Sequence, residues 1–322
     1  MKKINNKNPK INLSNNLESD FKNNLIKFRK KIDKIDYKIL ELLQKRMLII
    51  KQVGELKSLH RQKFFIRSNR EADMIKNLIV KMQDNRKKLS LPEFPVEAII
   101  DIWRKIISSA NIAEQEVKIA IYNPSKINDY RLLINQYYQH SFVSGDFTKS
   151  SKALKMLDKQ EYQIAVFNLL EKRDDDIWWL EITKYSYLKI FTKIPFYQFS
   201  NQQKIELIAV ADKECEASQA DYSYLVIKNS ELDQKMITKL LKKNNIKARF
   251  IDNFQSHKAN NFLIEIEGFY LNDSSPIIDL IDFIAPTGKK TTGKKTADKK
   301  ITGKKTTTEL FIIGHSPLPI KI

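Results

Sequence analysis

Two basic residues occupy positions where a long N-terminal helix should be apolar. Over residues 25–57, apolar side chains recur at steps of three, four and seven, a spacing that places them on one face of an α-helix. Arg46 lies on this face four residues after Leu42, and Lys57 lies on it four residues after Val53. The face contains no Asp or Glu, and a buried cation without a partner is strongly destabilising. The pattern predicts that both cations bind an anionic ligand; the alternative is that they snorkel at the edge of the face.

The net charge is high, but much of it is local. The chain has 322 residues, enough for about two or three domains, and a formal net charge of +19. A five-residue Lys/Thr repeat over 287–306 contributes +7 of that charge. The chain is also rich in Lys, Asn and Ile, as an AT-rich genome produces without functional selection. We therefore expect no nucleic-acid partner, although a basic chain of this kind is typical of one.

Cysteine and histidine usage argues against a metal site. The single cysteine, Cys215, excludes an internal disulfide and a Cys-based metal site, and the four His residues show no ligand spacing. No apolar run approaches the roughly 18 residues of a membrane span. The N-terminus begins basic but has no apolar signal segment, so residues 1–17 are expected as a disordered polar leader. We expect a cytoplasmic protein with no metal and no membrane partner.

The first third of the chain is predicted to be helical. One long helix should run over residues 18–60. A second should begin at Ser68, because Ser68 and Glu71 have the spacing of a capping box before an apolar run. A third should follow Pro95, and Glu114 extends its apolar face as another polar residue at a core position. These helices would form a domain over residues 18–116.

After residue 116 the apolar pattern changes to that of β-strands. An α/β region over 117–219 should be followed by a small α+β sandwich over 220–322. The Lys/Thr-rich segment 287–308 offers little to bury and is expected as a flexible surface insertion. The expected strands are 117–122, 162–170, 188–195, 205–211, 222–227, 248–251, 261–267 and 309–313, with helices at 151–157, 232–243 and 276–284.

The helical part contains a series of motifs at residues 28–36, 42–47, 53–57, 69–72 and 106–110. In these motifs and their order it resembles the all-helical chorismate mutase domain, in the form fused to prephenate dehydratase in many bacteria. The resemblance covers roughly residues 20–116 and implies a three-helix protomer in an intertwined dimer. It also implies a pericyclic rearrangement of chorismate to prephenate, without cofactor, metal or covalent intermediate, driven by positioning and preorganised charge.

The same resemblance assigns roles to five residues. Arg29, Arg46 and Lys57 would bind the two substrate carboxylates, and Lys57 would also donate to the ether oxygen. Arginine suits this task because its planar fork can bind both oxygens of a carboxylate. Arg70 and Glu71 match an Arg-Glu pair at the start of the second helix, where Arg70 would bind substrate. Glu71 would accept a hydrogen bond from the ring hydroxyl; its alternative role is to cap its own helix.

Three positions depart from the family pattern. Glu114 stands where many relatives have Gln as the ether-oxygen donor, so it should act protonated and favour acid pH. The next residue, Gln115, points about 100° away and is a poor substitute. Ala110 replaces a frequent Ser. Arg67 stands at a position that is often Asp, and it is either a further carboxylate ligand or a solvent-facing residue.

The spacing of two arginines predicts a shared site. Arg29 lies 17 residues before Arg46, which is about 25 Å along a helix. No Arg side chain spans that length within one protomer. If Arg29 serves the site, it comes from a second chain, in agreement with the family's interlocked dimer. The spacing does not distinguish a dimer from a larger oligomer.

The second half resembles, more faintly, the dehydratase and regulatory ACT portions of such fusion proteins. The resemblance implies a periplasmic-binding-like α/β domain over 117–219 and an ACT-like subdomain over 220–322. The dehydratase motif Thr-Arg-Phe is missing, because the matching stretch, 204–207, reads Lys-Ile-Glu-Leu. We predict that dehydratase activity is lost while the fold persists.

Three alternatives to a monofunctional chorismate mutase stay open. The first is a bifunctional chorismate mutase/prephenate dehydratase, and the second is a non-catalytic regulatory protein that binds a dicarboxylate. The third is nucleic-acid binding through the Lys/Thr repeat, which predicts binding that weakens steeply with salt. Whether phenylalanine regulation survives is also open.

Overall fold

The chain forms two compact units in its computed structural model, Met1–Ser58 and Leu59–Ile322. The segment 287–308, expected as a flexible insertion, lies outside the described residues except for its last residue. The described residues are 9–59, 66–114, 116–138, 142–171, 175–198, 205–230, 232–256, 259–284 and 308–321.

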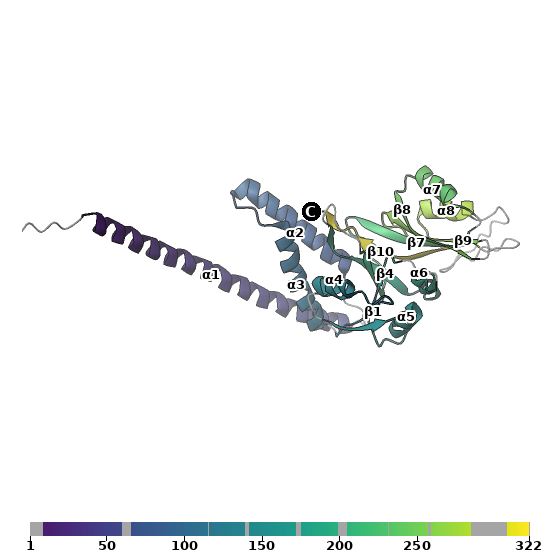
Figure 1. Ribbon diagram of the computed structural model, residues 1–322, viewed down its shortest axis with the longest axis horizontal. Helices are drawn as coiled ribbons and strands as arrows, with labels where there is room; N and C mark the ends of the chain where they lie inside the picture. The colour runs from purple at the N-terminus through teal and green to yellow at the C-terminus, as the bar shows by residue number, and fades with distance from the viewer. Residues whose placement is uncertain are drawn as a thin grey trace, which may run out of the picture. The chain divides into compact units, whose positions relative to one another are not determined.

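The described residues of the first unit form one long helix, α1, which spans Pro9–Leu59 (Figure 1). It begins earlier than predicted, so residues 9–17, which were expected in the disordered leader, are helical. Pro9 suits the first turn because its fixed φ is helical and its missing N–H has no intrahelical acceptor there. Along the predicted apolar face, Phe28, Ile32 and Leu42 are each more than half exposed.

The second unit begins with two helices and continues as an α/β structure. Its helices are α2 (Ser68–Leu89), α3 (Val96–Glu114), α4 (Asn128–Tyr138), α5 (Ser150–Asp158), α6 (Trp178–Glu181), the 3₁₀ turn Ile182–Lys184, α7 (Gln234–Lys243) and α8 (Ser275–Ile284). Its main strands are β1 (Lys118–Tyr122), β2 (Val143–Phe147), β3 (Ile164–Asn168), β4 (Leu188–Ile194), β6 (Leu207–Asp212), β7 (Asp221–Ser230), β8 (Ala248–Ser256), β9 (Ala259–Glu267) and β10 (Glu309–Pro317). Two short strands, β5 (Tyr197–Gln198) and β11 (Ile320–Lys321), pair separately.

One nine-stranded sheet crosses the boundary that the sequence placed near residue 220. The strand order is β2-β1-β3-β6-β4-β10-β7-β9-β8, with β1, β2 and β3 parallel to one another. The C-terminal strand β10 lies between β4 and β7, pairing parallel with β4 and antiparallel with β7. At the β4 contact Gly314 has a φ of +143°, and a side chain there would collide with the backbone of Ile190. The strands of the part before residue 220 and of the part after it therefore belong to one sheet, because β10 joins them.

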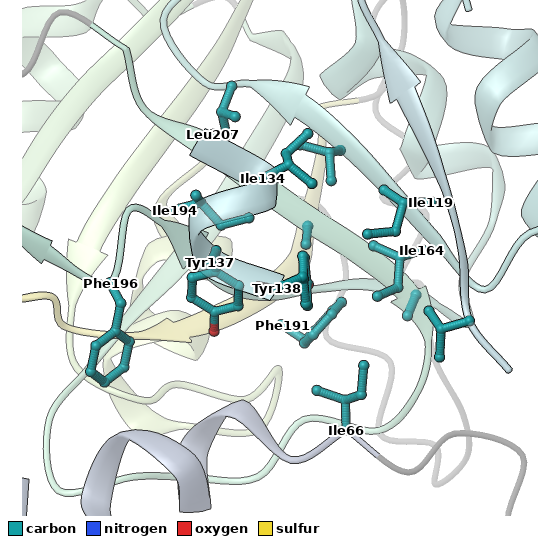
Figure 2. Packing of buried hydrophobic residues seen from close by; sticks show 14 of the residues in the cluster. Ile66, Ile119, Ile134, Tyr137, Tyr138, Ile164, Phe191, Ile194, Phe196 and Leu207 are labelled. Carbon is teal, nitrogen blue, oxygen red and sulfur yellow. The ribbon is translucent and has the colours of Figure 1, made fainter. Parts of the chain in front are cut away.

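Helices cover both faces of this sheet. Residues of α2, α3 and α4 pack with β1, β3, β4 and β6 in one core cluster, and α5 and α6 pack on the opposite face. Figure 2 shows the first cluster, in which Tyr137 and Tyr138 of α4 lie near Phe191 and Ile194 of β4. A third cluster packs α7 and α8, which lie side by side in Figure 1, against β7 and β9.

Candidate active site

Three of the predicted ligand-binding cations lie on α1. Arg29 is exposed, and Arg46 and Lys57 are half-buried. Because α1 is one uninterrupted helix, Arg29 and Arg46 are about 25 Å apart along its axis. Lys57 lies in the last turn, where the helix carbonyls favour a positive charge. One continuous element thus carries all three cations.

The start of α2 differs from the predicted capping box. Ser68 is the first residue of the helix, and Arg67 at the N-cap makes no side-chain cap hydrogen bond. The Ser68 hydroxyl instead donates to the backbone carbonyl of Phe191 in β4. The capping-box prediction, and with it the alternative role of Glu71 as a cap, is wrong, because packing on the sheet uses the Ser68 hydroxyl.

Glu71 is buried and accepts hydrogen bonds from two side chains of α3. Arg104 Nη1 lies 2.9 Å from Glu71 Oε2, and Asn111 Nδ2 lies 3.1 Å from Glu71 Oε1. Glu71 is 8% exposed and Arg104 is 2% exposed, so this ion pair is screened little by water. A carboxylate oxygen has two lone pairs, and each oxygen of Glu71 can therefore accept a further donor.

Arg104 is the residue of this cluster that the motifs did not identify. Its guanidinium lies 3.9 Å from the centre of the Tyr137 ring and 5.5 Å from that of Phe196. Burial alone would lower the pKa of Arg104, but its electrostatic interactions with Tyr137 and Glu71 and its hydrogen bond to Glu71 raise that pKa above its ordinary value. The sequence contained a signal for this residue. Arg104 lies four residues after Ile100, so it is a cation at an apolar position of the third helix, as Arg46 and Lys57 are on the first.

The other predicted residues of this unit are more open. Arg70 is exposed, and Glu114, the last residue of α3, is half-buried. The side of α3 that contacts Glu71 carries Arg104 and Asn111; Glu114 follows Asn111 by three residues, which displaces it by about 60° around the helix.

Two other departures from the family pattern have distinct surroundings. Ala110 is buried. Arg67 is half-buried with Nη1 3.8 Å from Glu216 Oε1, so it has a carboxylate neighbour in the α/β region.

Polar contacts anchor α2 to the α/β region. Lys213 Nζ donates to the carbonyl of Ile66 over 3.1 Å. The backbone N–H and side-chain amide of Gln219 donate to Asp73 and Asn77 over 3.0 Å and 3.1 Å. The helix that carries Glu71 is therefore fixed against the sheet, and the position of Glu71 depends on that packing.

A cavity of about 290 Å³ lies beside Arg104, between α3, α4 and residues 195–197. The acidic residue that lines it is Asp101. The pKa of Asp101 is raised above its ordinary value, mainly by burial and then by the negative charge of Glu97. None of the six predicted site residues lines this cavity.

Glu206, in the stretch that matches the missing dehydratase motif, lies in a network of ion pairs. Glu206, just before β6, receives two hydrogen bonds from Arg249, over 2.9 Å and 2.5 Å. Lys193 lies 2.6 Å from Glu206 and 2.9 Å from Glu265. Burial alone would raise the pKa of Glu206, but Arg249 and Lys193 lower it to about 2. The network therefore holds a carboxylate ion within the stretch that matches the missing motif.

The described part of the chain offers no arrangement of three or more His, Cys, Asp or Glu residues that could hold a metal ion. Within the same residues, no helix has both the length and the apolar character needed to cross a membrane.

Residues 28–116 match the model of the chorismate mutase type II family. The matched segment contains all six predicted site residues, Arg29, Arg46, Lys57, Arg70, Glu71 and Glu114. This segment is therefore similar to chorismate mutases of type II, as its motifs predicted.

A curated relative shares this segment. The bifunctional chorismate mutase/prephenate dehydratase of Aquifex aeolicus (strain VF5) is 33% identical over 100 residues, which is 31% of this chain and 26% of that protein. The chain thus matches about a quarter of the length of this relative.

Solved structures with a distant likeness cover 63% of this chain. A prephenate dehydratase from Streptococcus mutans is 10% identical with a TM-score of 0.38 over 99% of that chain. A prephenate dehydratase from Arthrobacter aurescens in complex with L-Phe is 10% identical with a TM-score of 0.41 over 90% of its chain. A quorum-quenching acylase is 13% identical with a TM-score of 0.41 over 95% of its chain. Likeness at this level carries no functional argument.

Proposed function

We propose that the protein converts chorismate to prephenate. The observation that carries the proposal is the family match over residues 28–116, which contains the expected cations and carboxylates in the family's order. The rearrangement is intramolecular, so the protein needs neither a nucleophile nor a cofactor. It must hold two carboxylates, fold the flexible arm over the ring, and stabilise negative charge that develops on the ether oxygen.

The proposed roles follow this division of work. Arg29, Arg46 and Arg70 bind the substrate carboxylates, where a planar guanidinium gives both charge and orientation. Lys57 binds a carboxylate and donates to the ether oxygen. Glu71 accepts a hydrogen bond from the ring hydroxyl, for which its lone pairs have capacity beyond Arg104 and Asn111.

A homodimer completes the proposed site. Arg29 is too far along α1 from Arg46 to reach the same ligand, so the proposal takes Arg29 from a second chain. The exposed apolar side chains of α1, such as Phe28 and Ile32, support this, because a second copy would remove them from water. A symmetric pair would then contain two sites.

The direct test is the loss of chorismate absorbance with the purified full-length chain between pH 4 and 8. We expect turnover by the wild type and a loss of at least about 100-fold in kcat/KM for Arg46→Gln, since a carboxylate ligand is removed. The matched control is Arg86→Gln, an exposed arginine of α2 that pairs with Glu93 and should leave turnover unchanged. No turnover at any pH would refute the proposal.

The alternative is a non-catalytic protein that binds a dicarboxylate. It would bind an oxabicyclic analogue of the transition state tightly and show no turnover. Calorimetry with that analogue, run beside the activity assay, separates the two functions.

For the α/β region we propose a scaffold or regulatory module without dehydratase activity, with a dehydratase-like part over 117–219 and an ACT-like part over 220–322. Support comes from Glu206, whose carboxylate is buried and paired with Lys193 and Arg249. The bifunctional alternative rests on the name of the Aquifex aeolicus relative, whose match spans only 100 residues.

A further inference from the structure

Arg104 is a buried cation for which the family motifs assign no role. We propose that Arg104 is a positioning residue, which fixes the Glu71 carboxylate for the mutase reaction; this inference rests on the chorismate mutase function proposed above. Arg104 acts through Glu71 and does not itself touch the substrate.

The contacts of the guanidinium hold it in one place. Its Nη1 reaches Glu71 Oε2 over 2.9 Å, while Nε and Nη2 face the carbonyl of Tyr137, each over 3.4 Å. The ring of Tyr137 lies 3.9 Å from the guanidinium carbon, within the range of a cation–π contact. Because its three nitrogens make hydrogen bonds and one face of the group contacts an aromatic ring, the guanidinium of Arg104 has little freedom to rotate.

The fixed guanidinium of Arg104 determines the orientation of the Glu71 carboxylate. Arg104 holds one oxygen and Asn111 holds the other, so the carboxylate plane cannot turn. The ring hydroxyl of a bound substrate must therefore approach the remaining lone pairs from one direction. Small errors in such an orientation reduce the rate of a reaction that depends on positioning.

The α/β region supplies part of this arrangement. Tyr137 belongs to α4, and its hydroxyl lies 3.0 Å from Thr192 Oγ1 in β4. Figure 2 shows Tyr137 near Ile194 and Phe196, and its ring is buried in this core cluster, which limits its movement. Arg104 therefore links the carboxylate of a mutase helix to the sheet on which that helix packs.

A lysine at this position tests the inference because it keeps the charge and loses the fork. We would measure kcat, KM and thermal unfolding for Arg104→Lys in two backgrounds, the wild type and Glu71→Gln. A Gln at 71 can still accept a hydrogen bond from the ring hydroxyl, so this background should keep measurable turnover. The matched control is Arg86→Lys, an exposed arginine of α2.

We expect Arg104→Lys to lower kcat by about tenfold in the wild type, with KM changed by less than about threefold, and to lower kcat by less than about twofold in the Glu71→Gln background. A purely structural role would produce equal losses in both backgrounds, and that result would overturn the inference. If Arg104→Lys does not fold, Asn111→Ser is measured in the same two backgrounds with the same criterion. Wild-type turnover with no loss in Arg104→Lys rejects this inference alone. Absence of wild-type turnover rejects the mutase function and this inference with it.

Discussion

The ammonium of Lys193 lies 2.6 Å from a carboxylate oxygen of Glu206, and both side chains are buried. The pair joins β4 to the residue that precedes β6. Glu265 and Arg249 complete the network from β9 and β8. Two of its four members lie before residue 220 and two after it. The network around Glu206, which lies in the stretch that matches the missing dehydratase motif, thus also connects the two parts of the sheet.

Glu206→Gln should destabilise the fold by about 3 kcal/mol at pH 7, because it leaves the buried Lys193 short of one partner. The pKa of Glu206 is lowered from 4.5 to about 2, so its contribution to stability is fully present above pH 4.5. That contribution is lost as the pH falls toward 2. The difference in the free energy of unfolding between variant and wild type should therefore shrink over this interval, as measured by urea unfolding.

The matched control for this measurement is Glu161→Gln. Glu161 is exposed and pairs with Lys159 over 3.6 Å, so its loss should change the free energy of unfolding by less than about 0.5 kcal/mol. A Glu206 variant as stable as this control at pH 7 would show that the network does not hold the sheet together.

The helices and most strands could be predicted because their apolar residues recur with a clear period. α1, α3, β3 and β9 each combine a sustained pattern with a Pro or polar boundary. β2, Val-Ser-Gly-Asp-Phe, was missed because it is an edge strand with little buried surface and no alternation of apolar residues. α4 was missed as well.

The capping box at Ser68 shows where local reasoning fails. Ser68 and Glu71 have the spacing of a capping box, but both side chains bind partners far away in the sequence. The Ser68 hydroxyl binds the carbonyl of Phe191, and the Glu71 carboxylate binds Arg104. Such partners depend on packing that no local pattern contains. The insertion of β10 between β4 and β7 also depends on long-range packing, because a strand near the C-terminus joins a sheet whose first strand begins at Lys118. The family motifs, in contrast, depend on order along the chain, and the match over residues 28–116 follows that order.

A mixture of two inactive variants should regain activity if the site is shared. Arg29→Ala and Arg46→Ala chains should each lose turnover, since each removes a carboxylate ligand from every site. After subunit exchange, half of the dimers are mixed and each has one intact site, so we expect up to about a quarter of the wild-type rate. The rate is followed by chorismate absorbance and the exchange by mass spectrometry of differently tagged chains. Confirmed exchange without recovery would contradict a contribution of Arg29 across the interface.

The α/β region should not make phenylpyruvate from prephenate. Expulsion of water and carbon dioxide needs a general acid, and no Thr, Ser or His lies at residues 205–211, where the dehydratase motif would place one. We expect phenylpyruvate formation at neutral pH to equal the spontaneous background in the same buffer. Chromatographic detection of enzyme-dependent phenylpyruvate would instead establish a bifunctional enzyme.

Glu114→Gln should raise mutase activity at neutral pH. A charged carboxylate would oppose the negative charge that develops on the ether oxygen, whereas a protonated one can donate to it. The wild-type rate should therefore rise as the pH falls, until the substrate carboxylates or the fold begin to titrate. A glutamine amide donates at every pH, so the variant should show a flatter profile of kcat against pH between 4 and 8. The matched control is Glu116→Gln, an exposed carboxylate two residues further on that pairs with Lys118, which should keep the wild-type profile. A Glu114→Gln profile that coincides with the wild type would mean that another group donates to the ether oxygen, and the role assigned to the end of α3 would have to be withdrawn.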